Sequence, residues 1–290
     1  MKRVLAVRNP PPMHWVGNGF PVRSVFAYHD LGQQLSPFLL LDHAGPYDFA
    51  PAERPRGVGV HPHRGFETVS IVYQGELEHR DSAGNSGALG PGDVQWMTAA
   101  SGILHEEFHS RGFTARGGTL EMVQLWVNLP AAKKMIDPGY QDILAADIPQ
   151  VELPGGGRLR LIAGDHEGRA GAARTQSPVE LWDLALPAGS AETLHLPEGH
   201  SAALVVLRGR IEVGGQLAAA GQLVLLSREE SALTISAAEP SLVLILGGAP
   251  LNEPIAGYGP FVMNSEAQIR QAMLDFQAGR FGRLEPVAAA

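Results

Sequence analysis

Apolar and polar residues alternate over short stretches along most of this chain, a period of two that is typical of half-buried β-strands. Residues 69–80 predict two strand segments arranged like a hairpin around Gly75, and residues 91–108 predict a turn followed by another strand region. The chain contains 35 Gly and 22 Pro, too many for long helices, while 44% hydrophobic residues can still form a core. We therefore expect an all-β fold of many short strands.

The strand pattern occurs a second time in residues 204–227. Gly209 and Glu212 of this second copy follow Gly75 and Glu78 of the first at the same offset. Self-similarity of this kind predicts two copies of one small β-domain. A chain of 290 residues also exceeds the usual single domain of roughly 100–150 residues.

The Pro-bounded stretch 130–153 is the candidate divide between the two copies. Its AAKKM segment can form a short helix. We therefore expect one domain in residues 1–140 and the other in residues 141–290.

The clearest helix signal lies near the C-terminus, in residues 264–282. Ser265 and Gln268 can form a capping box, and Gly279 can end the helix. The predicted apolar face consists of Ile269, Ala272, Met273 and Phe276. We expect this helix to pack on the β-domains.

Charge and composition exclude several classes of function. The formal net charge is −8, and the only adjacent lysines are Lys133 and Lys134, so direct nucleic-acid binding is disfavoured. The absence of Cys excludes disulfides, thiolate metal sites and cysteine nucleophiles, and it fits a reducing compartment. The apolar stretch between Arg3 and Arg8 is too short for a signal peptide, and no apolar run approaches membrane length. We expect a soluble cytoplasmic protein.

The stretch HPHRGFETVS, residues 61–70, contains a candidate metal site. In a strand, residues two apart point to the same side, so His61 and His63 project together, as do His105 and Glu107. If neighbouring strands bring the two pairs together, three imidazoles and one carboxylate can surround a divalent ion. Such a donor set suits Fe(II), and also Mn, Ni, Cu or Zn.

A competing interpretation concerns residues 105–112, HEEFHSRG, which match the H-E-x-x-H pattern of metalloproteases. The longer form of that pattern requires a third histidine where this chain has Ala115. It also requires a helix that places His105 and His109 on one face with Glu106 as the base. The segment follows a turn and strand pattern instead, which disfavours a protease.

Three further polar residues could lie near the metal site. Glu67 follows His63 by four positions and competes with Glu107 for the fourth ligand position; it could instead accept a hydrogen bond from a ligand imidazole. His79 and His109 are assigned to strand ends, where histidines more often face solvent, so we expect both to be exposed.

Only the first copy can form a histidine cluster. At the offset of the repeat, His61 falls on His195, but His63 falls on Pro197, and no histidine follows His200.

Long motifs spread over most of the chain carry a resemblance to a known family. They are SPFLLLDHAGP (36–46), HPHRGFETVS (61–70), PGDVQWMTAASGILHEE (91–107), VQLWVNLP (123–130) and GAPLNEPI with GYGPFVMN (248–264). With these motifs the chain resembles the pirin family of the cupin superfamily. The resemblance implies a bicupin fold, in which two tandem antiparallel β-barrels of jelly-roll type are followed by a short C-terminal helix.

The resemblance also implies a ligand set. Carried over residue by residue, the family's metal ligands are His61, His63, His105 and Glu107, whereas Glu67 is not usually a ligand. The family holds one metal ion, usually iron, in the N-terminal barrel, and its C-terminal barrel is free of metal. We therefore expect one divalent ion, with Fe(II) ahead of Cu, Ni, Mn and Zn.

Several pirins are described as quercetin 2,3-dioxygenases, which open the central ring of a flavonol with O2 and release carbon monoxide. In this hypothesis Glu107 also acts as the catalytic base that accepts the proton of the flavonol hydroxyl. The substrate would be a flavonol or another chelating enol. The alternative is a metal-dependent, redox-sensing regulatory protein that binds protein partners without physiological turnover.

Overall fold

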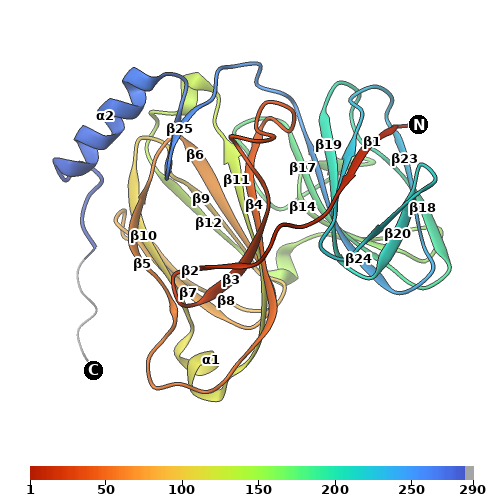
Figure 1. Ribbon diagram of the computed structural model, residues 1–290, viewed down its shortest axis with the longest axis horizontal. Coiled ribbons are helices and arrows are strands. Elements are labelled where there is room, and N and C mark those ends of the chain that lie inside the picture. The colour runs from red at the N-terminus through yellow and green to blue at the C-terminus, as the bar shows by residue number, and fades with distance from the viewer. Residues whose placement is uncertain (285–290) are drawn as a thin grey trace. The chain divides into compact units, whose positions relative to one another are not determined.

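The computed structural model describes residues 1–284, and most of their regular structure is β-strand (Figure 1). These residues form two compact units, each drawn from separate parts of the chain. Unit 1 consists of residues 1–12, 24–43 and 145–252, and unit 2 of residues 13–23, 44–144 and the described residues from 253 onward. Each unit contains residues from both sides of position 140, so a division of the chain at that position stays a prediction.

Unit 2 is built on a larger and a smaller β-sheet with antiparallel pairs. The larger sheet has the order β12 (Gly139–Ile143), β9 (Val94–Thr98), β6 (Phe66–Gln74), β11 (Gly118–Asn128), β4 (Phe38–Phe49), β3 (Phe20–Ala27) and β2 (His14–Val16). Residues 24–27 of β3 and 38–43 of β4 belong to unit 1. The smaller sheet has the order β5 (Gly57–His63), β10 (Ile103–His109), β7 (Leu77–Asp81) and β8 (Ser86–Leu89). The other elements are the pair β25 (Ala256–Tyr258) and β26 (Phe261–Met263), the helices α1 (Arg111–Arg116) and α2 (Glu266–Gln277), and the 3-10 turn η1 (Ala131–Lys133), which lies where a short helix is predicted.

Unit 1 repeats this arrangement. Its larger sheet has the order β1 (Val4–Arg8), β22 (Leu223–Leu226), β19 (Ser201–Arg208), β24 (Ser241–Gly248), β17 (Val179–Leu186), β14 (Arg158–Ala163) and β13 (Gln150–Glu152). Its smaller sheet has the order β18 (Ser190–His195), β23 (Ala232–Ala237), β20 (Arg210–Val213) and β21 (Gln216–Ala219). The short elements are β15 (Asp165–His166), β16 (Arg169–Ala170) and the 3-10 turn η2 (Ala145–Asp147). The predicted all-β fold with two related domains is confirmed.

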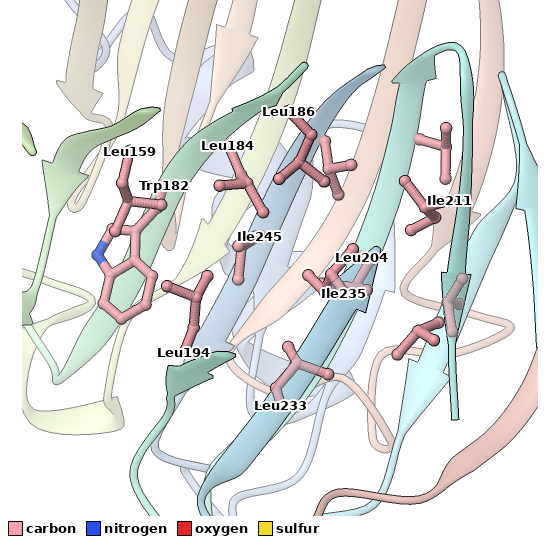
Figure 2. Packing of buried hydrophobic residues seen from close by; sticks show 14 of the residues in the cluster. Leu159, Trp182, Leu184, Leu186, Leu194, Leu204, Ile211, Leu233, Ile235 and Ile245 are labelled. Carbon is pink, nitrogen blue, oxygen red and sulfur yellow. The ribbon is translucent and has the colours of Figure 1, made fainter. Parts of the chain in front are cut away.

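The interior of unit 1 is filled by large apolar side chains, which Figure 2 shows pointing toward one another. They include Leu159, Trp182, Leu184, Leu194, Leu204, Ile235 and Ile245. The indole N–H of Trp182 donates to the carbonyl of Ala163 at 3.0 Å, so this buried polar group is satisfied. Burial of each such aliphatic side chain stabilises the fold by about 1.5–3 kcal/mol.

The turn at Gly75 differs from the hairpin that residues 69–80 predict. It joins β6 to β7, which belong to different sheets, so the two strands do not pair. Gly75 has a φ of 88° and Gly209, between β19 and β20, has a φ of 75°. Glycine adopts this left-handed backbone at low cost. The repeated glycine therefore marks the point where the chain passes from one sheet to the other in both units.

The capping of helix α2 follows the prediction. The Ser265 side chain accepts a hydrogen bond from the backbone N–H of Gln268 at 3.3 Å. The Gln268 side chain in turn accepts from the backbone N–H of Asn264 at 2.9 Å. The helix ends at Gln277, two residues before Gly279, whose φ is 73°.

The predicted apolar face of α2 is only partly buried. Ile269 and Ala272 are buried, and Met273 packs against them. Phe276 is 40% exposed, so its assignment to the buried face is wrong. Its ring only borders those of Phe261 and Phe281, with centroids 6.2 and 5.9 Å away.

No helix within residues 1–284 is both long and apolar enough to cross a bilayer. The cytoplasmic location stays a prediction.

Candidate metal centre

The two histidines of the HPH motif lie on one face of strand β5. Strand β10 pairs antiparallel with β5 and places His105 directly opposite His61. Residues opposite each other in an antiparallel pair project to the same side of the sheet. The ring centroids lie 4.2 Å apart for His61 and His105, 4.8 Å for His63 and His105, and 4.9 Å for His61 and His63. One nitrogen from each ring lies within 4.8 Å of the others, so this triad could hold a metal ion.

Each imidazole of the triad has a ring nitrogen available to a metal ion. His63 and His105 are 4% and 1% exposed, and burial, followed by the neighbouring histidines, lowers the pKa of each well below its usual value. Both are therefore neutral near pH 7, the form that binds metals. His63 Nδ1 and His105 Nε2 are buried and have no hydrogen-bond partner among the described residues, a costly arrangement that a metal ion would relieve. His61 Nδ1 lies 2.8 Å from the Gly59 carbonyl oxygen, which leaves Nε2 available.

Glu107 lies beyond a bulge in the pairing of β10 with β5. The hydroxyl of Ser70 lies 3.1 Å from Glu107 Oε1 and 2.9 Å from Gln124 Oε1, and it can donate to either. Glu107, His105 and His79 form a second group whose donor atoms lie within 4.8 Å of one another. His105 belongs to both groups. The set of four ligands that includes Glu107 stays a prediction.

The C-terminal part of unit 2 holds the HPH motif in place. The Pro260 carbonyl accepts a hydrogen bond from the backbone N–H of Arg64 at 3.3 Å. The Val262 N–H donates to the Arg64 carbonyl at 3.0 Å. These two backbone hydrogen bonds fix the turn that directly follows His63.

A buried lysine strengthens the same junction. Lys134 Nζ donates to the carbonyls of Gly65 and Val262 at 2.6 and 3.0 Å, and to Asn128 Oδ1 at 2.5 Å. Burial lowers the pKa of Lys134 to about 7. No signal in the sequence indicated this role, because two of its three acceptors, the carbonyls of Gly65 and Val262, are distant along the chain.

Comparison with known proteins identifies the family. Residues 19–127 match the family described as Pirin, and residues 181–282 match the Pirin C-terminal cupin domain. The chain belongs to the pirin family. The expected bicupin fold with a short C-terminal helix is thereby confirmed.

Relatives of this pirin cover nearly its full length. A crystal structure from Acinetobacter baumannii titled quercetin 2,3-dioxygenase has a TM-score of 0.95 and 52% identity, over 98% of this chain and 100% of that chain. A Pseudomonas aeruginosa protein with the provisional name quercetin 2,3-dioxygenase is 58% identical over 98% of this chain and 99% of its own. Human Pirin is 34% identical over 92% of this chain and 89% of its own. This pirin is therefore a homologue, at high identity, of proteins named quercetin 2,3-dioxygenase.

Both potential metal-ligand groups found within residues 1–284 of this pirin lie in unit 2. In unit 1, strand β18 occupies the place that β5 has in unit 2. Leu194 of β18 is fully buried in the apolar core, whereas His195 is exposed. His200 Nδ1 lies 2.9 Å from Glu180 Oε2 and forms an ion pair with it when protonated.

Glu67 faces away from the histidine triad. It lies three residues before Ser70 on β6, and residues three apart in a strand point to opposite faces. Its carboxylate accepts a hydrogen bond from Thr98 Oγ1 at 2.7 Å, and burial raises its pKa to about 7. Glu67 belongs to neither of the two potential ligand groups within residues 1–284.

His79 and His109 are buried, at 4% and 1% exposure, so the expectation that both face solvent is wrong. His109 packs its ring against Phe49, with centroids 4.6 Å apart, and its Nε2 lies 2.9 Å from the Gly19 carbonyl oxygen. His79 lies in the middle of β7 rather than at its end. Leu77, His79 and Asp81 are buried alternately along β7, and the sequence signal that could have placed His79 on the inner face is its position two residues after the apolar Leu77.

The HEEFH segment forms strand β10 and not a helix. His105 joins the metal-ligand triad, while His109 packs in a separate aromatic cluster. The preference against a metalloprotease site is confirmed by this geometry, because the two histidines do not share one helical face.

Proposed function

We propose that this pirin is a mononuclear metal dioxygenase that opens the central ring of flavonols such as quercetin with O2. The observation that carries the proposal is the triad of His61, His63 and His105, of which His63 and His105 are buried and each have a ring nitrogen without a hydrogen-bond partner within residues 1–284. It occurs in a chain that is 52% identical to a protein whose structure is titled quercetin 2,3-dioxygenase. The ion is Fe(II) in this proposal, and Cu, Ni, Mn and Zn are alternatives that the same donors accept.

Each residue of the site has a defined task. The three histidines hold the ion as neutral ligands, and the Pro260 carbonyl fixes the backbone next to His63 by its hydrogen bond with the Arg64 N–H. When bound, the ion supplies a positive centre that lowers the pKa of a coordinating hydroxyl. Strands β5 and β10 fix the relative positions of the imidazoles, because the pairing of His61 with His105 belongs to the sheet itself.

Glu107 is the ligand and catalytic base in this proposal. The residue is 8% exposed, so its side chain is largely screened from bulk water, and its carboxylate accepts the proton of the flavonol hydroxyl. In this proposal the Ser70 hydroxyl, which lies within hydrogen-bond distance of both Glu107 Oε1 and Gln124 Oε1, donates to Glu107. A positioned general base accelerates proton transfer by about 10²–10⁴-fold.

The direct test measures both gases of the reaction. Wild-type protein is freed of metal, loaded anaerobically with Fe(II) and mixed with quercetin and O2. We expect O2 consumption at an oxygen electrode and an equal amount of carbon monoxide, detected by its binding to haemoglobin. If neither occurs with Fe, Cu, Ni or Mn, the dioxygenase proposal is overturned, and regulation through protein partners becomes the leading interpretation.

Two variants test the residue roles. His63→Ala should lose metal binding and activity together, and activity without His63 would show that the ligand set is different. Glu107→Gln should lower kcat by about 10²–10⁴-fold. Glu106→Gln is the matched control. Glu106 forms an ion pair with Arg80 and belongs to neither potential ligand group within residues 1–284, so this variant should be as active as the wild type.

A further inference from the structure

His79 and Asp81 extend the metal centre by a chain of contacts behind His105. His105 Nδ1 lies 3.4 Å from His79 Nδ1, and His79 Nε2 lies 3.6 Å from Asp81 Oδ2. All three side chains are buried, at 1%, 4% and 3% exposure respectively. The pairing of β10 with β7 places His105 opposite Asp81 and Glu107 opposite His79, so the sheet register holds the chain together.

Asp81 and His79 are themselves held firmly. Asp81 Oδ1 accepts hydrogen bonds from the backbone N–H groups of Ala83 and Asn85, at 2.9 and 3.0 Å, and Oδ2 accepts from Asn85 Nδ2 at 2.9 Å. The ring of His79 stacks on that of Tyr140, with centroids 5.2 Å apart and an interplanar angle of 16°. Neither side chain can turn away without breaking these contacts.

The proton positions follow from the chemistry of neutral imidazole, which has one N–H donor and one acceptor nitrogen. If His79 Nε2–H points to the Asp81 carboxylate, then His79 Nδ1 is an acceptor. His105 Nδ1–H can donate to it, and this leaves the lone pair on His105 Nε2. That nitrogen is the one without a partner among residues 1–284.

We propose that His79, oriented by Asp81, is a positioning residue that holds His105 in the tautomer whose Nε2 faces the metal ion. This inference rests on the metal site of the proposed function. Ligand histidines generally donate their second ring N–H to a fixed acceptor, and loss of that acceptor lowers metal affinity about 10–100-fold. Here a second histidine provides the acceptor.

The competing role for His79 is that of a direct ligand, since His79, His105 and Glu107 form a group of their own. The contacts favour positioning. His79 Nδ1 lies 3.4 Å from His105 Nδ1, on the side of the His105 ring away from the partnerless Nε2, and His79 Nε2 lies 3.6 Å from the Asp81 carboxylate. His79 Nε2 makes no hydrogen bond within residues 1–284, and its nearest charged neighbour is Asp81 rather than the histidine triad.

The test compares Co(II) affinity in metal-free wild-type protein and three variants, by competition with a chromogenic chelator. His79→Phe keeps an aromatic ring against Tyr140 but removes the acceptor, and it should bind Co(II) about 10–100-fold more weakly. His79→Asn keeps an acceptor near the position of Nδ1 and should recover most of the affinity. His109→Phe, which replaces another buried histidine of β10 outside the metal site, should bind Co(II) as the wild type does.

Pulsed EPR of the Cu(II)-loaded proteins separates positioning from ligation by counting the bound imidazoles. The count should be the same in wild type and His79→Phe, and a lower count in the variant would make His79 a ligand and overturn the inference. Equal Co(II) affinity of His79→Phe and wild type would overturn it as well, with the metal site intact. If the wild type itself binds no Co(II), the proposed metal site fails together with the inference.

Nitrogen-15 NMR of the Zn(II)-loaded wild type gives a test that does not depend on the folding of variants. We expect His105 to carry its proton on Nδ1 and to show a scalar coupling across the hydrogen bond to His79 Nδ1. A proton on His105 Nε2 would overturn the inference.

Discussion

Gly65, two residues after His63, shows how closely the backbone packs behind the candidate metal centre. Its φ is 91°, and a Cβ atom added to it would lie 1.9 Å from the carbonyl oxygen of Val262. Only glycine fits there, because the backbone conformation and the space both exclude a side chain. The approach of Val262 is part of the contact that orients the HPH motif.

Replacement of Gly65 tests this packing against a matched glycine. Gly84 has a φ of 90° and open space around its Cβ position, so Gly84→Ala measures the backbone strain alone. We expect Gly65→Ala to lower the free energy of unfolding by on the order of 1–3 kcal/mol more than Gly84→Ala, because it adds a steric clash. Urea unfolding measures both values, and equal losses would show that Val262 moves aside freely.

Glu67 gives a pH dependence with a defined sign. Burial raises its pKa in the folded protein to about 7, above the usual value of 4.5, so the native state binds the extra proton. Its contribution to stability is therefore complete below about pH 4.5 and is lost as the pH rises through 7. The loss between pH 4.5 and pH 8 is on the order of 3 kcal/mol.

Glu67→Gln should remove this dependence, since glutamine does not titrate. The difference in unfolding free energy between the variant and the wild type, measured in urea from pH 4.5 to pH 8, should shift in favour of the variant as the pH rises. A difference that stays constant over that range would contradict the raised pKa.

At the scale of elements, helix α2 is fastened to the turn that follows the HPH motif. Arg64 Nη1 lies 2.7 Å from Asp275 Oδ2, and Arg64 Nε donates to the Ser101 carbonyl at 2.6 Å. Asp275 also accepts hydrogen bonds from Gln271 and Arg280. The pKa of Asp275 is lower than usual, and the largest cause of this shift is the hydrogen bond from Arg64. The helix is thus anchored next to His63 by a largely buried ion pair.

Asp275→Asn should destabilise unit 2, because it leaves the buried guanidinium of Arg64 without a counter-charge. We expect the free energy of unfolding to fall by on the order of 3 kcal/mol, as when other buried pairs are broken. Glu266→Gln is the control on the same helix, since the ion pair of Glu266 with Arg270 is exposed and should contribute almost nothing. Similar urea midpoints for both variants would contradict the anchoring role.

At the scale of the whole molecule, the same sheet arrangement surrounds a histidine cluster in unit 2 and an apolar core in unit 1. The sheets of units 1 and 2 have matching strand orders, yet β5 carries two histidines of the candidate metal centre and β18 carries Leu194 into an apolar core. The offset that aligns Gly75 with Gly209 places His61 on His195, which is exposed. The offset between the two copies therefore changes within this strand. The inward-facing position of β18 is Leu194, one residue before the position that the fixed offset indicates.

Metal loading should accordingly stabilise unit 2 locally. At a free Co(II) concentration 100 times the Kd, binding adds about 2.7 kcal/mol to the stability of the binding-competent state. Hydrogen exchange measured by mass spectrometry should show slower exchange in β5 and β10 and little change in β17 and β24, with reversal by a chelator. Unchanged exchange in β5 and β10 would place the ion elsewhere.

The sequence by itself determined the strand-rich fold, the duplication, the capping of α2 and the pairs His61 with His63 and His105 with Glu107. Each of these features depends on residues close together in the chain or on motifs long enough to be specific. The alternation of side chains between the two faces of a strand, for example, is a local property. Only the tertiary structure decided that Gly75 joins two sheets, that Phe276 is exposed and that His79 and Asp81 lie behind His105. These depend on which distant strands pair and in what register, and that choice is set by the packing of the whole unit.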